Sequence, residues 1–106
     1  MEKEKLDQFS AKVFSEQLHT RFKVHVDAPG PLELELAEVN EHKTSPQIEL
    51  FSLIFRGPLT PRLMQQTHQL EHGKLGTFDI FLTPVGLDGN GTLYEAVFHR
   101  FSKLQP

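Results

Sequence analysis

Apolar residues near the N-terminus repeat with the spacing of an α-helix. Between Lys5 and Leu18 they recur mostly every three or four positions, with charged and amide residues on the opposite face. The apolar positions are Leu6, Phe9, Val13, Phe14 and Leu18. This spacing predicts one short amphipathic helix over about residues 5–18. Because a helix of that length is marginal alone, we expect its Phe-bearing face to cover one end of a sheet or barrel in preference to binding a partner.

From Arg21 onward the pattern changes to the alternation that is typical of β-strands. Gly- and Pro-rich stretches interrupt it and divide the rest of the chain into six predicted strands. The predicted strands cover residues 22–26, 32–36, 47–56, 65–72, 77–85 and 92–101. Asp-Gly and Asn-Gly in the stretch between the last two tolerate positive φ, so we expect these two strands to form a hairpin.

Two of the predicted strands stand out by their composition. Strand 47–56 is apolar on both faces, which predicts a central position with both faces covered. Strand 65–72 has only Leu70 as a clearly apolar residue, which predicts an edge strand or a largely solvated one.

One helix followed by six strands predicts a mainly β fold. Sequential strands usually neighbour one another, so the expected strand order is an antiparallel meander. Closing such a sheet removes its edges, and we therefore expect a six-stranded antiparallel small barrel or a strongly bent sandwich, with the N-terminal amphipathic helix against one opening. At 106 residues the chain is expected to be a single domain, 1–106, with a β body over about residues 21–101 and a short tail at 102–106.

The distribution of charge argues against several classes of function. The formal net charge is -3, with nine acidic against six basic residues through Gln47 and five of each afterwards. No basic stripe is present, which disfavours nucleic-acid binding. No apolar run is long enough to span a bilayer and the N-terminus lacks an apolar signal region, so we expect no membrane contact and a cytoplasmic location. The absence of cysteine excludes disulfides, thiol catalysis and cysteine-based zinc sites.

Several short motifs resemble a family of short bacterial proteins known only as a domain of unknown function. The motifs are FSLIFRGP at 51–58, LEH at 70–72 followed by LG at 75–76, FLTPVG at 81–86 and YEAVF at 94–98. The likeness covers nearly the whole chain, but it brings no activity and no catalytic residues. It implies a bacterial origin, a compact β domain and a loose association with phage-tail-like or surface assemblies. One departure is the exit of the helix, where the family pattern has a Gly and this chain has His19-Thr20.

The histidines are candidate metal ligands or rim residues of a pocket. His68 and His72 point to the same face of a predicted strand, about 13 Å apart at roughly 3.3 Å per residue. That separation is too large for a shared metal ion, so we expect no metal site and interpret both as polar side chains on a solvated strand. His99 is a further candidate for a binding site.

Arg56 and Glu95 lie in or at the end of apolar strands, where a charged side chain is usually paired. We expect Arg56 to form a salt bridge with a carboxylate such as Glu95, or to bind carbonyl groups of the loop 57–61. The alternative is that Arg56 binds an anion or carboxylate at the mouth of a barrel.

No arrangement in the sequence combines a nucleophile, a base and an orienting group. The Ser residues lie in no Gly-x-Ser-x-Gly turn, no Gly-rich phosphate loop opens a helix, and Glu33 and Glu35 are interpreted as one charged outer face. We therefore expect a protein without enzymatic activity or cofactors that acts as a protein-interaction or scaffolding module. The alternative is a small-ligand or anion-binding barrel, or an enzyme with a pocket near Arg56, with His68 or His99 at the rim.

Overall fold

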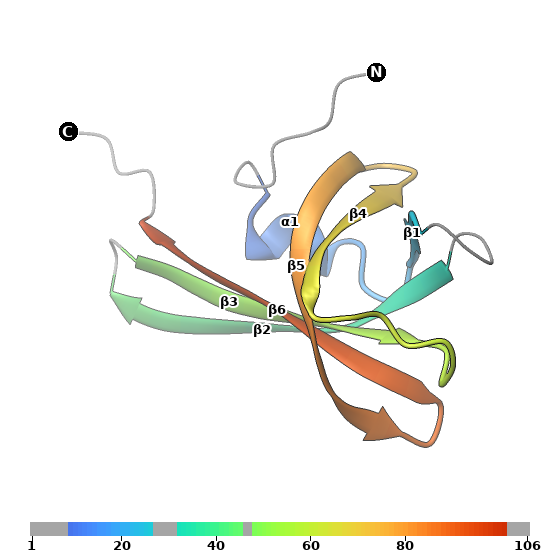
Figure 1. The fold of residues 1–106 in the computed structure, drawn as a ribbon. Helices are drawn as coiled ribbons and strands as arrows, with labels where there is room; N and C mark the ends of the chain where they lie inside the picture. The colour runs from blue at the N-terminus through green and yellow to red at the C-terminus, as the bar shows by residue number, and fades with distance from the viewer. Residues whose placement is uncertain (1–8, 27–31, 46–47, 102–106) are drawn as a thin grey trace.

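A computed structural model describes the backbone over residues 9–26, 32–45 and 48–101 (Figure 1). Six strands form a closed barrel in which every neighbouring pair is antiparallel. The elements in chain order are α1 (Ala11–Ser15), β1 (Arg21–Val24), β2 (Leu32–Ser45), β3 (Ile48–Gly57), β4 (Gln66–His72), β5 (Gly76–Asp88) and β6 (Gly91–Phe101). The predicted fold class, a six-stranded antiparallel barrel with one helix near the N-terminus, is confirmed.

The order of the strands around the barrel differs from the expected meander. It runs β1-β2-β3-β6-β5-β4, so each half of the chain forms a three-stranded meander of its own. The two halves meet where β3 pairs with β6 along its whole length and where β1 pairs with β4 at two positions. The expected neighbours β3 and β4 are separated because residues 58–65 connect them across one end of the barrel (Figure 1).

Several strands are longer than the alternation predicted, and this gives the barrel its shape. β2 continues to Ser45, well beyond the predicted end at Leu36, although residues 46–47 lie outside the described part of the chain. In Figure 1 the far ends of β2, β3 and β6 leave the barrel together as one three-stranded extension, whereas the β5–β6 hairpin projects in another direction. β5 and β6 are paired from the turn at Asp88 and Gly91 as far as Thr83 and Glu95. Beyond Thr83 and Glu95 the two strands diverge.

The helix is shorter than predicted within the described residues, and α1 ends at Ser15 rather than at Leu18. It begins where the Ser10 hydroxyl accepts a hydrogen bond from the Val13 amide, as a helix N-cap does. It ends in tight turns that lead to His19, whose φ of 69° lies in the left-handed region. Residues 1–8, which hold the predicted start of the helix, lie outside the described residues.

Aromatic side chains fill the interior of the barrel. Phe14 of α1 is fully buried and its ring centroid lies 6.3 Å from Phe51, 6.3 Å from Phe78 and 5.8 Å from Phe98. α1 therefore packs between the diverging strands and covers one opening, as expected from its Phe-bearing face. Further fully buried residues are Phe22, Leu34, Leu36, Leu53, Phe55, Leu70, Leu82 and Tyr94.

Of the two strands singled out by composition, β3 is partly as expected, whereas β4 is neither an edge strand nor a solvated one, since it pairs with both β5 and β1. β3 is central, between β2 and β6, but no helix or strand among the described residues covers its outer face, where Leu50 and Ile54 are half-buried. β4 is not a solvated strand, because His68, Leu70 and His72 on its inner face are all buried. Alternation alone could not show this, because the imidazole rings occupy positions where apolar side chains are more usual.

Candidate functional site

Arg56 lies at the end of β3 and points to the outer face of the barrel, because its neighbour Phe55 points inward. Its guanidinium binds the Asp88 carboxylate through Nε at 2.9 Å and through Nη2 at 2.8 Å, both to Oδ2. A third contact joins Nη1 to Oε1 of Glu35 at 3.3 Å. The prediction that Glu95 pairs with Arg56 is therefore wrong. Glu95 lies opposite Ile54 in the ladder, and the carboxylates that contact Arg56 belong to Glu35 of β2 and to Asp88 at the β5–β6 turn.

Asp88 connects this ion pair to the hairpin turn. Its Oδ1 accepts a hydrogen bond of 2.8 Å from the Asn90 amide, while Oδ2 faces Arg56. The hydrogen bond from Arg56, followed by that from the Asn90 amide, holds the pKa of the Asp88 carboxyl below its usual value. The same contact with Asp88 raises the pKa of Arg56. Both groups are charged at neutral pH, and the turn and β3 are held together by opposite charges.

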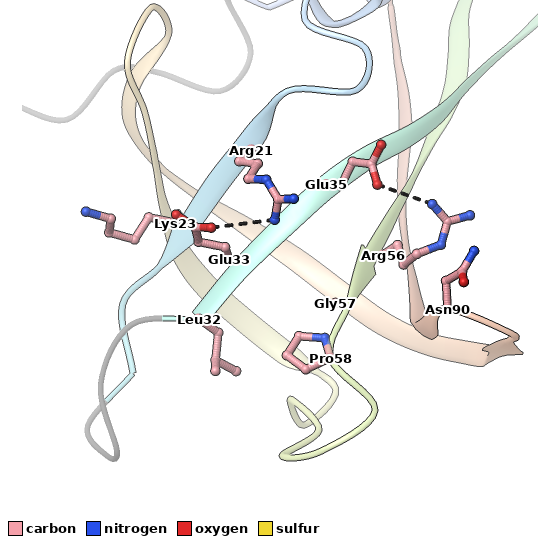
Figure 2. A pocket seen from close by; sticks show the side chains of 9 residues that line it. All are labelled: Arg21, Lys23, Leu32, Glu33, Glu35, Arg56, Gly57, Pro58 and Asn90. Atoms are coloured by element: carbon pink, nitrogen blue, oxygen red, sulfur yellow. Dashed lines mark hydrogen bonds and ion pairs between the residues drawn. The ribbon is translucent and has the colours of Figure 1, made fainter.

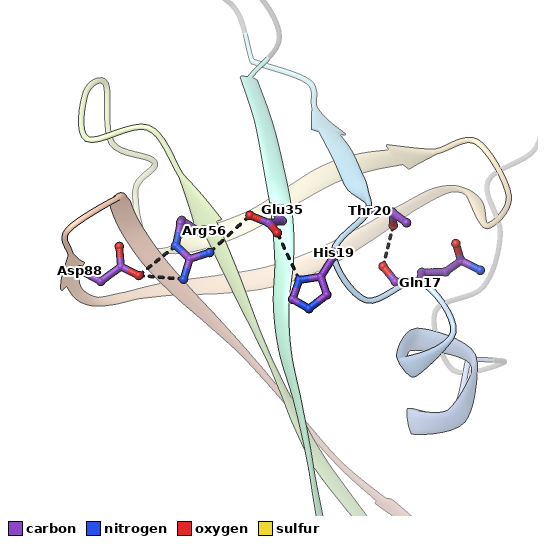
Figure 3. Close-up of polar contacts among 6 residues, drawn as sticks. All are labelled: Gln17, His19, Thr20, Glu35, Arg56 and Asp88. Atoms are coloured by element: carbon purple, nitrogen blue, oxygen red, sulfur yellow. Dashed lines mark hydrogen bonds and ion pairs between the residues drawn. The ribbon is translucent and has the colours of Figure 1, made fainter.

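Glu35 extends the contact to the segment that leaves α1. One carboxylate oxygen of Glu35 faces Arg56, and the other lies 3.2 Å from Nδ1 of His19 (Figure 3). The His19 amide also donates to the carbonyl of Leu36 at 2.7 Å. We refer to Asp88, Arg56, Glu35 and His19 as the outer network. It joins the β5–β6 turn, β3, β2 and the α1–β1 connection across the outside of the barrel.

Two glycines permit the close approach that the outer network requires. A Cβ atom at Gly91 would lie 2.0 Å from the carbonyl oxygen of Gly57, so a side chain there would displace the backbone. A Cβ atom at Gly57 would lie 2.6 Å from Cδ2 of Leu34. The Arg-Gly-Pro end of β3 is thus explained by packing against the hairpin and the core.

An open groove of about 710 Å³ lies beside the outer network (Figure 2). Its lining residues are Arg21, Lys23, Leu32, Glu33, Glu35, Arg56, Gly57, Pro58 and Asn90. Two of its three cationic side chains already have carboxylate partners, since Arg21 faces Glu33 at 3.6 Å and Arg56 binds Asp88 and Glu35. The groove is therefore a mixed-charge surface, and Arg56 is not an open anion clamp.

A second polar cluster centres on His72. Its Nδ1 accepts hydrogen bonds from the backbone amides of Lys74 at 3.0 Å and Leu75 at 3.3 Å. An acceptor Nδ1 leaves the proton on Nε2, which faces the Thr20 hydroxyl at 2.9 Å. Thr20 in turn donates to the carbonyl of Gln17 at 2.6 Å (Figure 3). Burial, followed by the charge of Lys74, lowers the pKa of His72.

The geometry of the Thr20–His72 pair is that of a structural contact rather than of a nucleophile and base. A base must present an unprotonated nitrogen to the hydroxyl, but two amide donors on Nδ1 place the proton on the nitrogen that faces Thr20. The ring also lies 4.4 Å from that of Phe22. His72 thus ties the α1–β1 connection to the β4–β5 turn.

The remaining candidates from the sequence do not converge with Arg56. His68 is buried on the inner face of β4, and its Nε2 lies 2.8 Å from the carbonyl of Met64. His99 is exposed on the outer face of β6, opposite Leu50. Glu95 forms no ion pair within the described residues. Arg56 and Glu95 share the outer face but not a contact, and His68 faces the other way.

The sequence held partial signals for the residues that were missed. Asp88 begins the Asp-Gly-Asn-Gly turn, where an Asp side chain often binds an amide two residues on, as it does here. His19 stands where a Gly was expected and has the positive φ that a Gly would adopt. No sequence signal indicated that His72 would be buried, because its partners are main-chain amides and a hydroxyl far away along the chain.

Comparison with known proteins gives a family match without an activity. A family model described as a domain of unknown function (DUF6916) matches residues 9–98. No curated protein and no solved structure shows a significant match to this chain. The matched range includes the barrel strands up to Phe98 and every residue of the outer network.

Proposed function

Because the chain belongs to the family described as a domain of unknown function (DUF6916), we infer its function from its surface, and we propose that it is a non-catalytic protein-interaction module. We place it in the cytoplasm of a bacterium, without contact to nucleic acid or membrane, as a component of a phage-tail-like or surface assembly. The acidic net charge and the resemblance of its motifs to short bacterial proteins support this context.

The observation that carries the proposal is an apolar surface at the loop end of the barrel. Leu59 on the β3–β4 connection is 53% exposed, and Val85 and Leu87 of β5 are 50% and 61% exposed. Leu59 and Leu87 are close together, because Thr92 lies opposite Leu87 in the ladder and its hydroxyl donates to the Leu59 carbonyl at 3.5 Å. We refer to Leu59 and Leu87 as the loop-end surface. Exposed apolar side chains that lie close together beside a loop favour contact with another protein.

The interior of the barrel supports a surface role rather than a ligand-binding one. Phe22, Phe55, Phe78 and Tyr94 are fully buried inside it, and Phe14 covers one opening. The Tyr94 hydroxyl accepts a hydrogen bond of 2.8 Å from the Leu63 amide, which holds the β3–β4 connection against the core. Side chains therefore occupy the space in which a small barrel would hold a ligand.

None of the described helices is long and apolar enough to cross a membrane.

The second candidate function is binding of a small anionic or zwitterionic ligand in the groove beside Arg56. The volume of the groove and its cationic side chains Arg21 and Lys23 favour it. Its mixed charge weighs against it, because a ligand would have to compete with Glu33 and Glu35 for those cations.

A thermal-shift screen against common metabolites, inorganic anions and divalent metals separates the two candidates. A protein-interaction module is expected to show no shift in Tm, because nothing in the screen binds the folded state preferentially. One reproducible stabilising anion whose effect disappears in the Arg21→Ala variant would overturn the proposal in favour of the groove.

A further inference from the structure

The outer face of β2, β3 and β6 carries an ordered pattern of side chains. Cross-strand partners share a face, so the ladder registers define three successive rows across these strands. The carboxylate row is Glu38, Ile54 and Glu95; the middle row is Asn40, Ser52 and Val97; the imidazole row is His42, Leu50 and His99. We refer to these nine residues as the sheet face.

No helix or strand among the described residues packs on the sheet face. α1 lies against the opposite side of the same strands, where Phe14 contacts Phe51 and Phe98. Val97 at one end of the middle row is 62% exposed, and Glu38, His42 and His99 are exposed. The apolar side chains Leu50, Ile54 and Val97 therefore form an unpartnered surface.

The charges on the sheet face are arranged symmetrically about the middle row. Successive rows are about 6.6 Å apart along the strands at roughly 3.3 Å per residue. The carboxylates of one outer row and the imidazoles of the other thus lie at equal distances on either side of Ser52. Ser52 is small and 7% exposed, so the centre of the face offers no bulky side chain against a close approach.

We propose that the sheet face binds the sheet face of a second copy of this chain, about a twofold axis that runs along the middle row. Rotation about this axis reverses the direction of the strands and keeps each strand over its own copy. It places Glu95 over the partner's His99, Glu38 over the partner's His42, and Ile54 over the partner's Leu50. Imidazole N–H groups donate to carboxylates, so both outer rows become complementary at once.

The alternative twofold axis, along the strands, is disfavoured by the same pattern. It would place Glu38 over the partner's Glu95, and like charges that face each other across an interface cost binding energy. The charge pattern therefore selects both the second copy as the occupant and one orientation for it.

The size of the sheet face sets the strength of the association. Three strands about 4.8 Å apart and five residues long cover roughly 14 Å by 17 Å, which belongs to the class of small, transient interfaces. We therefore expect a dimer that dissociates on dilution. The loop-end surface is not part of the sheet face, so the dimer would present that surface twice.

Sedimentation equilibrium of the full chain from about 10 µM to about 1 mM tests the dimer. The wild type is expected to show a reversible monomer–dimer equilibrium. Val97→Glu places two carboxylates close to each other near the axis and is expected to leave only monomer. Glu95→Lys is expected to raise the dissociation constant about tenfold, whereas Glu71→Lys, the same charge change on β4, is expected to leave it unchanged.

The double variant Glu95→Lys/His99→Glu restores opposite charges across the interface and is expected to recover the dimer. Thermal unfolding of each variant checks that the exposed substitutions leave the fold intact. A wild type that is monomeric at all concentrations would overturn the proposal. So would a dimer that survives Val97→Glu, or one that the double variant does not restore.

Discussion

Arg56 and Asp88, which are 32 positions apart in the chain, are joined by a hydrogen bond from Nε and an ion-pair contact from Nη2, both to one carboxylate oxygen. The side chains are 28% and 31% exposed, so solvent reaches the pair but does not separate it. The pair closes the β5–β6 turn onto the end of β3. Arg56 therefore has a structural role, and the Arg-Gly-Pro sequence marks where the end of β3 is bound to the β5–β6 turn.

We predict that Arg56→Ala lowers the free energy of unfolding by about 1–2 kcal/mol, since it removes charge-assisted hydrogen bonds at a partly buried position. Urea denaturation measures the change. Asp88→Asn is the matched control for the turn, because its side-chain oxygen can still accept from the Asn90 amide while the charge facing Arg56 is lost. Combining the two substitutions should cost less than the sum of their separate effects. An Arg56→Ala variant as stable as the parent would contradict the structural role.

The pKa of His72 predicts a loss of stability in mild acid. The unfolded chain binds a proton near pH 6.5, but in the folded chain burial lowers the pKa of His72. Between these two pKa values the unfolded state binds more protons than the folded state. The free energy of unfolding therefore decreases as the pH falls below 6.5, and the full contribution of His72 to stability is present above that pH. Urea denaturation between about pH 7.5 and about pH 5 measures the slope, which His72→Gln should reduce.

The ring nitrogens of His72 offer a separate check on its tautomer. Nitrogen NMR should show an unprotonated Nδ1 and a protonated Nε2 at neutral pH, because Nδ1 accepts from the amides of Lys74 and Leu75. A proton on Nδ1 would contradict the hydrogen-bond assignment and would reopen a catalytic interpretation of Thr20.

Gly91 and Gly89 provide a matched pair for the close approach of the hairpin to β3. Gly91→Ala is expected to cost about 1–3 kcal/mol, because the added Cβ would overlap the carbonyl oxygen of Gly57. Gly89→Ala in the same hairpin should change stability little, because nothing lies within 4 Å of its added Cβ. Thermal unfolding of the two variants makes the comparison, and equal effects would mean that Gly57 and Gly91 do not approach as described.

His19 tests whether backbone conformation or its side-chain contact matters more at the helix exit. With φ at 69°, His19→Gly removes left-handed strain but loses the exposed contact with Glu35, so stability should stay equal or rise by up to about 1 kcal/mol. His19→Val should cost about 1–2 kcal/mol, because a β-branched residue tolerates this conformation poorly. A valine variant as stable as the glycine variant would show that the segment adopts another conformation.

The sequence predicted those parts of the fold in which the alternation of apolar and polar residues matches the buried and exposed faces of a strand. Phe51, Leu53 and Phe55 revealed their strand and their inward face because burial and alternation agree there. The order of the strands was not predictable in this way, since the β3–β6 pairing depends on contacts between residues far apart in the chain. The extension of β2 to Ser45 was missed because its polar residues beyond Leu36 pair with β3 outside the barrel, where burial does not constrain them.

The site residues were predictable only where local chemistry dictated the contact. Arg56 was correctly expected to be paired, but its partner depended on the position of the hairpin turn, and Glu95 was the wrong carboxylate. The Asp-Gly turn predicted the hairpin but not that Asp88 would use its second oxygen for Arg56. Such contacts arise from the closure of the barrel, which brings separate turns together.

The most direct test of the proposed function is a quantitative comparison of proteins captured from the native lysate by three forms of the full chain. The wild type is compared with the double variant Leu59→Ser/Leu87→Ser, which makes the loop-end surface polar; Leu18→Ser, an exposed apolar position on the α1–β1 connection, is the control. We predict that a defined partner binds the wild type and the Leu18→Ser variant but is lost from the double variant. A partner that binds all three forms equally, or no partner in any of them, would contradict a protein-interaction module that acts through this surface.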